Sequence, residues 1–269
     1  EVIEILKREI YKLEIENLLD RPIILRRGAG AYICGEESAM IESIEGKRGL
    51  PRHRPPYIAE IGLFNRPTLN HNIETLNWIP QIIDNGVNWF KNKGWNENHS
   101  GLRSYSVSGR VKNPGLKLAP AGIPLRNLID DYCGGMQAGH ELKAFFPGGA
   151  SGGILPANLV DLPLDFGVFE KYGGFIGSHA IVVLSHADSI KTVVVNTMRF
   201  FKHESCGQCT PCRSGTDKMI RLLENKNGEL SLYRDLIKVM GDSSICGLGQ
   251  AASNCVDHLI RYFPDELLA

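Results

Sequence analysis

Four of the seven cysteines are spaced in a way that suits metal chemistry. Cys206, Cys209 and Cys212 form a CxxCxxC triad, and Cys246 follows after 33 further residues. A loop of this kind can wrap three thiolates around one face of a cubane iron–sulfur cluster, while a fourth cysteine arrives from elsewhere in the fold. Because the chain has only one such triad, the spacing predicts one [4Fe-4S] cluster and electron transfer as the leading function.

Two other uses of these cysteines must be weighed. Four cysteines can also close a structural zinc site, usually as two separated CxxC pairs, and the chain would then be a metal-stapled interaction scaffold without catalysis. Disulfides are disfavoured because seven cysteines is an odd number and no signal peptide precedes them. The triad spacing favours the cluster over zinc, and zinc stays open on the residues alone.

Cys255 competes with Cys246 as the fourth ligand. Cys246 lies in SSICGLG, where glycine amides can approach cluster sulfurs. Cys255 instead lies in AASNCVDHLIRYF, whose apolar residues recur with helical period. We therefore predict Cys246 as the ligand and Cys255 as a buried, inert helix residue.

Composition excludes several classes of function. Thirty basic and thirty acidic residues give no net charge, which argues against a nucleic-acid-binding protein. No apolar stretch approaches the ~20 residues of a membrane span, so direct membrane insertion is not expected. The cysteine usage predicts a reducing, cytoplasmic location.

The sequence divides into three regions that differ in residue pattern, and together these regions must position the cysteines. Residues 1–100 read as mixed α/β, with a helix over residues 1–19, a buried strand at Pro22–Leu25 and a helix at Ser38–Ile44 that Gly46 ends. Because the chain begins at Glu1 inside a helix-like run, we expect it to be an excised piece.

Residues 101–190 read as a small β-rich module. Alternating residues from Tyr105 to Val111, followed by an Asn-Pro-Gly turn at 113–115, predict a β-hairpin. One helix around Leu125–Ile129 and strands at Leu142–Phe146 and 180–184 follow. Residues 196–269 read as helical and carry the cysteines. The fold class is thus α+β.

A glycine-rich turn precedes the Ser38 helix. Its sequence, RRGAGAYICGEE, spaces the glycines as GxGxxxxG and not as the GxGxxG of dinucleotide-binding folds. Small residues still let backbone amides approach a ligand, and the following helix N-terminus favours anions. Glu36 and Glu37 suit a ligand role and a helix-dipole role equally. The basic stretch KRGLPRHRPPY could hold phosphates beside Tyr57, or be a solvated loop.

Taken together and in this order, these segments resemble a known family. RRGAGAYICGEESAMIESIEGKRGLPRHRPPY, NHNIETL, SGRVKNPG, ESCGQCTPCRSG and SICGLG resemble the flavin-bearing, NADH-binding subunit of respiratory complex I and the diaphorase subunits of NAD-linked hydrogenases and formate dehydrogenases. GKRGLPRHRPPY and NHNIET look most like the β subunit of cytosolic NAD-dependent molybdenum formate dehydrogenases.

The resemblance implies cofactors and site residues. It implies FMN, NAD and one [4Fe-4S] cluster, carried by part of an α/β flavin-binding domain (1–100), an SLBB-type β-grasp module (101–190) and a helical cluster domain (196–269). Tyr57 would stack on the NAD adenine. The residues expected to bind cofactors are Gly28, Gly30, Tyr32, Gly35, Glu36, Glu37, Tyr57, Asn70, His71, Asn72 and Thr75, and the expected cluster ligands are Cys206, Cys209, Cys212 and Cys246.

The chain departs from the family pattern in two places. It has Asn70-His71-Asn72 where the family usually has Val-Asn-Asn. The family's first glycine-rich loop, of GRGGAGF type, would lie upstream of Glu1, so we expect residues 1–269 alone to bind FMN weakly.

The function implied by the resemblance is hydride exchange between NAD(H) and FMN, followed by one-electron transfer to the cluster. The implied partners are a thioredoxin-like [2Fe-2S] subunit and a larger catalytic subunit, with molybdenum formate dehydrogenase favoured. A complex I or NAD-linked hydrogenase subunit is the alternative, and no residue is expected to act as a general base or nucleophile.

Overall fold

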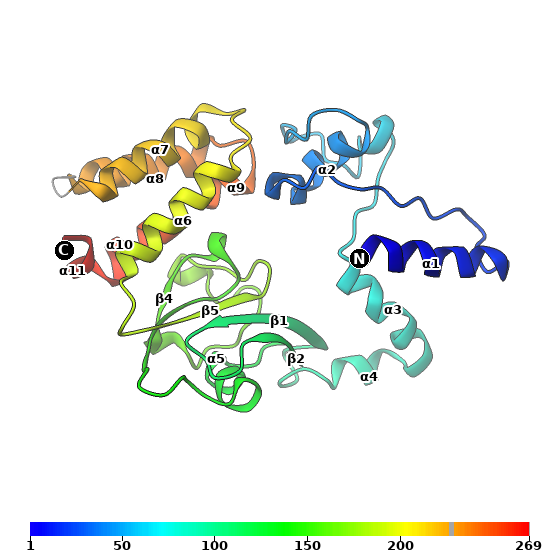
Figure 1. Ribbon diagram of the computed structural model, residues 1–269, viewed down its shortest axis with the longest axis horizontal. Helices are drawn as coiled ribbons and strands as arrows, with labels where there is room; N and C mark the ends of the chain where they lie inside the picture. Colours follow the sequence, from blue (N-terminus) through cyan, green and yellow to red (C-terminus); the bar gives the residue numbers. More distant parts are fainter. Residues whose placement is uncertain (226–228, 269) are drawn as a thin grey trace. The chain divides into compact units, whose positions relative to one another are not determined.

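The chain forms two units, Glu1–Asn70 and His71–Ala269. The computed structural model describes residues 1–225 and 229–268, so residues 226–228 and 269 of the predicted C-terminal region lie outside the described part. The predicted boundaries near residues 100 and 190 stay predictions. In the first unit the helices are α1 (Val2–Ile15) and α2 (Glu37–Ile44); in the second they are α3 (Ile73–Asn85), α4 (Val87–Lys91), α5 (Leu125–Asn127), α6 (Ile190–Glu204), α7 (Thr210–Glu224), α8 (Leu230–Ser243), α9 (Gly247–Ala251), α10 (Asn254–Tyr262) and α11 (Pro264–Leu268) (Figure 1).

The predicted N-terminal helix is confirmed as α1, which ends four residues earlier than expected, at Ile15. Salt bridges one turn apart, Glu4 to Lys7 and Glu9 to Lys12, both at 3.0 Å, lie along its surface. None of its residues is buried.

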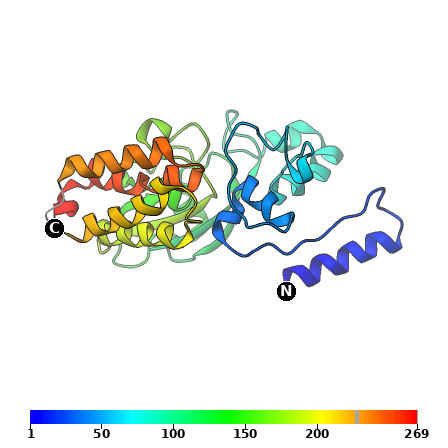
Figure 2. The same cartoon turned by 90° about the horizontal axis from the view of Figure 1, so that it is seen from above.

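The predicted strand at Pro22–Leu25 is wrong. These residues form an extended connection between α1 and α2 (Figure 2), and Ile24 is 77% exposed. A strand is stabilised by hydrogen bonds to a neighbouring strand, and no strand of the described residues pairs with this segment. The apolar run alone could not reveal that its partner was missing.

Helix α2 matches the prediction closely. Its N-cap is Glu36, whose carboxylate accepts a hydrogen bond from the Ala39 amide at 2.9 Å. Ile41 is buried on its inner side. After the helix, Gly46 adopts φ 79°, a left-handed conformation that glycine reaches without strain.

A five-stranded sheet forms the centre of the second unit, in the order β2-β1-β5-β3-β4. The predicted hairpin is confirmed by the antiparallel pairing of β1 and β2. β1 also pairs parallel to β5, and β3 pairs antiparallel to β5. The sheet is thus mixed, with β1 and β5 as its parallel pair, and the SLBB-type β-grasp assignment stays a prediction. The strands are β1 (Leu102–Gly109), β2 (Gly115–Pro120), β3 (Leu142–Phe146), β4 (Leu155–Pro156) and β5 (Ala180–Ser185).

One short helical segment covers this sheet, as predicted. It consists of α5 and a π-helical turn over Leu128–Tyr132. Leu125, Leu128 and Ile129 are all buried, and they share one core with Phe145 and Phe169. The apolar spacing therefore identified both the helix and the face that it buries.

The C-terminal helices pack on one another beyond the sheet. α6 packs against α7 and α10, and α7 packs against α8 (Figure 1). Gly215 of α7 lies so close to Met240 of α8 that an added Cβ would come within 2.7 Å of its sulfur. In α10, His258 accepts a hydrogen bond from the Ile154 amide at 3.0 Å, which ties the helices to the β-rich module. No helix within residues 1–225 and 229–268 has the length and apolar character required to traverse a lipid bilayer.

An ion pair fixes the turn between β5 and α6. Arg110 binds the carboxylate of Asp188 with two hydrogen bonds of 2.7 and 3.1 Å, and the Ser185 amide adds a third at 2.9 Å. The guanidinium hydrogen bond is the main cause that lowers the pKa of Asp188 to about 2. The Asp188 side chain is only 16% exposed, so solvent screens this pair less than a surface pair.

We expect Asp188→Asn to lower the free energy of unfolding by about 1–2 kcal/mol at neutral pH. Because the pKa is depressed in the folded state, the stabilisation is complete above the unfolded aspartate value of about 3.9 and is lost as the pH falls toward 2. Urea unfolding of both proteins between about pH 6 and pH 3 measures this. Asp161→Asn, which breaks the exposed pair with Arg126, is the control and should change stability little; an equal loss in both variants would contradict the assignment.

Candidate cofactor sites

Two helix N-termini position the predicted cluster ligands. Cys206 lies in the loop after α6, Cys209 is the N-cap of α7, and Cys212 lies in the first turn of that helix. Cys246 is the N-cap of α9. Helix N-termini carry partial positive charge and favour thiolates. Gly207 adopts φ 76° and so allows the chain to turn within the triad.

The four cysteines lie near enough for their charges to interact. Burial is the main cause that raises the pKa of the Cys212 thiol, the hydrogen bond with Ser205 lowers it, and the negative charges of the other three cysteines raise it further. A bound metal centre would reverse this shift, because metal coordination deprotonates thiols outright. Among the described residues, no three His, Cys, Asp or Glu side chains form the close group that a single metal ion requires. Four cysteine thiolates are a donor set that an iron–sulfur cluster takes, and the ligand roles stay predictions.

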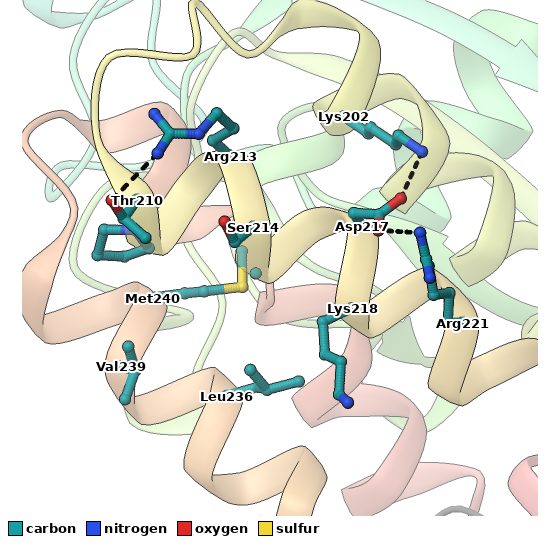
Figure 3. Close-up of a pocket in the computed structure, with 12 residues that line it drawn as sticks. Lys202, Thr210, Arg213, Ser214, Asp217, Lys218, Arg221, Leu236, Val239 and Met240 are labelled. Carbon is teal, nitrogen blue, oxygen red and sulfur yellow. Dashed lines mark hydrogen bonds and ion pairs between the residues drawn. The ribbon is translucent and has the colours of Figure 1, made fainter.

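Polar contacts hold the triad loop in place. The Ser205 hydroxyl lies 3.3 Å from the Cys212 sulfur and accepts a hydrogen bond from the Gly207 amide at 3.3 Å. Arg213 donates to the Gly207 carbonyl and, at 3.2 Å, to the Thr210 hydroxyl (Figure 3). The loop between α6 and α7 is thus tied to the first turn of α7 on both sides of Cys209.

A groove of about 760 Å³ runs along α7 and α8 next to this loop (Figure 3). Within it, Asp217 lies between Lys202 and Arg221, at 2.6 and 2.9 Å. Arg213 and Lys218 also line the groove. Together with Lys202 and Arg221 they make four cationic side chains, and Asp217 is the one carboxylate among the lining residues. The surface beside the cysteines is therefore positive, although the chain as a whole is neutral.

Cys255 has the surroundings predicted for it. It lies in α10 with its side chain fully buried, and its sulfur is 3.7 Å from the Ala252 carbonyl of the preceding turn. Burial raises the pKa of Cys255 to about 12. Its predicted place in a buried helix is confirmed, and such a thiol stays protonated at neutral pH.

The glycine-rich turn is open on one side. Within the described residues, no atom lies within 4 Å of the position that a Cβ would occupy at Gly28, Gly30 or Gly35. Gly30 also has φ 78°. Tyr32 begins a 3-10 turn that ends at Gly35 and leads into α2. The space beside these three Cα atoms is therefore open, which lets a ligand approach the backbone closely.

Arg54 explains what Glu36 and Glu37 do in this structure. Its guanidinium pairs with the Glu36 carboxylate and, at 2.9 Å, with that of Glu37. Glu36 is also the cap of α2, so the helix-terminus interpretation of this residue is confirmed and the ligand role stays a prediction. The sequence pattern did not indicate Arg54 as the partner, because 18 residues separate it from Glu36.

The basic stretch is largely neutralised. Lys47 pairs with Glu45 at 2.6 Å, and Arg52 pairs with Glu42 at 2.6 Å. With Arg54 also paired, three of the four Lys and Arg side chains of this stretch have carboxylate partners, and its phosphate-binding role stays a prediction. Tyr57 remains 55% exposed and available for stacking.

The remaining predicted flavin contacts fall on both sides of the boundary between the units. Asn70 ends the first unit, whereas His71, Asn72 and Thr75 belong to the second. The Asn72 side chain accepts from the Glu74 amide at 2.9 Å and thereby caps α3. His71 and Thr75 are exposed at the start of the same helix.

Two family models match the chain, one at each end. Residues 192–269 match the NADH-ubiquinone oxidoreductase-F iron-sulfur binding region, and residues 1–81 match the Nuo51 FMN-binding domain. The predictions of a [4Fe-4S] cluster and of FMN agree with the two family descriptions.

Curated relatives agree with these matches. An NADH-quinone oxidoreductase subunit of Mycobacterium bovis is 42% identical over 259 residues, which cover 93% of this chain and 57% of the relative. The corresponding NADH-quinone oxidoreductase subunit of Rickettsia typhi is 40% identical over 255 residues, which cover 92% of this chain and 60% of the relative. The chain thus spans about three fifths of the length of these relatives.

A solved structure is also similar. The crystal structure of an NAD+-reducing [NiFe]-hydrogenase in its H2-reduced state matches with a TM-score of 0.79 and 35% identity, over 90% of this chain and 42% of that chain. The predicted enzyme class, an NADH-dependent oxidoreductase subunit, agrees with all of these relatives. None of them distinguishes the formate dehydrogenase branch from the other two.

We expect Cys246→Ser to remove or alter the electron paramagnetic resonance signal of the cluster, because it replaces a thiolate at the N-terminus of α9. Cys255→Ser should keep that signal, since the buried thiol of α10 lies outside the ligand group. Iron content and the spectrum of both variants, purified without oxygen from the full-length protein, decide the matter. The opposite pattern would assign Cys255 as the fourth ligand.

Proposed function

We propose that this chain belongs to a subunit for NAD(H)-linked electron transfer, in which hydride passes between NAD(H) and FMN and single electrons then pass to a [4Fe-4S] cluster. The observation that carries this proposal is the gathering of four cysteines by the N-termini of α7 and α9. The glycine-rich turn on the same chain, within the match to an FMN-binding domain, supports the flavin half.

The chain's own residues would supply binding and orientation. The open amides around Gly28, Gly30 and Gly35 would hold FMN, and Tyr57 would stack on the adenine of NAD. Asn72 and Thr75, near the N-terminus of α3, would contact the flavin phosphate or ribityl chain. When bound, FMN supplies the exchange between two-electron hydride chemistry and one-electron transfer.

We assign the subunit to the cytosolic NAD-dependent molybdenum formate dehydrogenase branch. This assignment rests on GKRGLPRHRPPY and NHNIET. The partners in that branch would be a thioredoxin-like [2Fe-2S] subunit and a larger catalytic subunit, and the location would be the cytoplasm. The alternative is a complex I-type or NAD-linked hydrogenase subunit, and relatives of both these kinds match the chain.

The test uses the full-length subunit separated from its partners for cofactor content, and the native assembly for activity. We expect about one FMN and four iron atoms per isolated subunit, together with NADH–ferricyanide activity of the assembly. Zinc in place of iron, with no flavin and no activity, would support the metal-stapled scaffold instead. Molybdenum and formate-dependent NAD reduction in the assembly would establish the branch, whereas nickel with hydrogen oxidation, or quinone reduction, would overturn it.

We expect Tyr57→Ala to weaken NADH binding about fivefold, since loss of aromatic stacking is worth about 1 kcal/mol. Tyr11→Ala is the control, because Tyr11 is similarly exposed, at 62%, on α1. The Michaelis constant for NADH in the ferricyanide assay measures the effect. Equal constants in wild type and both variants would leave Tyr57 as a residue of a solvated loop.

A further inference from the structure

Two serine hydroxyls lie beside the cysteine group, and neither is a metal ligand by type. The first belongs to Ser205, directly before the triad. Its oxygen already accepts a hydrogen bond from the Gly207 amide, and it lies 3.3 Å from the Cys212 sulfur. When Cys212 is a thiolate, the sulfur has no proton to give. The Ser205 hydroxyl must then be the donor in this contact.

The second hydroxyl belongs to Ser244, which follows α8 and precedes Cys246 by two residues. Its amide donates to the Met240 carbonyl at 3.3 Å, and its carbonyl accepts from the Gln250 side chain at 3.0 Å. The backbone of Ser244 is thus satisfied. Its hydroxyl is buried and has no hydrogen-bond partner among the described residues, which is uncommon and needs a physical reason.

Gly249 locates this hydroxyl relative to the cysteines. A Cβ added at Gly249 would lie 2.6 Å from the Ser244 hydroxyl oxygen and 2.9 Å from the Cβ of Cys212. The Ser244 hydroxyl oxygen and the Cys212 Cβ therefore both lie close to Gly249. The unpartnered hydroxyl lies beside the same cysteine that Ser205 contacts. Ser244 approaches this cysteine from the C-terminal end of α8, whereas Ser205 follows α6.

We propose that Ser205 and Ser244 donate hydrogen bonds to the sulfur atoms around Cys212 and thereby raise the reduction potential of the cluster bound there. The proposal rests on the proposed function, since it requires a redox-active cluster. Hydrogen bonds to the sulfurs are among the factors that set the potential of an iron–sulfur cluster. The reduced cluster has one more negative charge, so a donor stabilises it more than the oxidised cluster.

The experiment uses the full-length protein with its cluster, in which Ser205→Ala and Ser244→Ala remove one hydroxyl each. Ser243→Ala is the matched control, because Ser243 is the exposed neighbour of Ser244 at the end of α8. Ser205→Thr keeps the hydroxyl, at a position that is only partly buried. The measurements are iron per chain, a redox titration followed by electron paramagnetic resonance, and the deuterium coupling to the cluster after exchange into heavy water.

We expect each alanine variant to keep its iron and to favour the oxidised cluster about tenfold more than wild type, which for a one-electron couple is ~59 mV to more negative potential. The deuterium coupling should weaken in the same variants, and the control and the Ser205→Thr variant should match wild type. An unchanged potential with full iron would overturn the proposal. Loss of iron from both alanine variants would also overturn it, by making the serines structural. Absence of any cluster from the wild-type protein would instead overturn the proposed function.

Discussion

Four thiolates in one partly buried place repel one another, and the C-terminal half of the chain is built around that constraint. Burial and neighbouring charge both act against ionising Cys212. Helix N-termini at Cys209 and Cys246 and the cationic side chains of the groove along α7 and α8 offset this repulsion. Cluster iron would supply the remaining positive charge. α7 and α8 cross tightly at Gly215, where an added Cβ would come within 2.7 Å of the Met240 sulfur.

In the first unit, charged side chains neutralise one another through ion pairs. Carboxylates and cations that are far apart in sequence neutralise each other around α2, through Arg52 with Glu42 and Arg54 with Glu36 and Glu37. The glycine-rich turn beside them begins with Arg26 and Arg27, which are both exposed. An anionic ligand could therefore be held there by these side chains as well as by backbone amides.

Local sequence patterns predicted much of this structure. The hairpin, the helix over Leu125–Ile129, the end of α2 at Gly46 and the burial of Cys255 each depend on residues that are close in the chain. The strand at Pro22–Leu25 failed because pairing depends on a distant partner, which alternation cannot reveal. Arg54 and Ser244 were missed for the same reason. Both residues matter because tertiary folding brings them close to side chains that are distant in the sequence. The only sequence signal for Ser244 was its place next to a cysteine motif.

Gly249 sets a mechanical limit on the cysteine group. A Cβ at this position would lie 2.6 Å from the Ser244 hydroxyl oxygen and 2.9 Å from the Cβ of Cys212. Glycine is therefore the residue that lets the start of α9 lie against both α7 and the end of α8. Any larger residue at position 249 would wedge these segments apart, so the spacing of the proposed ligands depends on a residue that has no side chain.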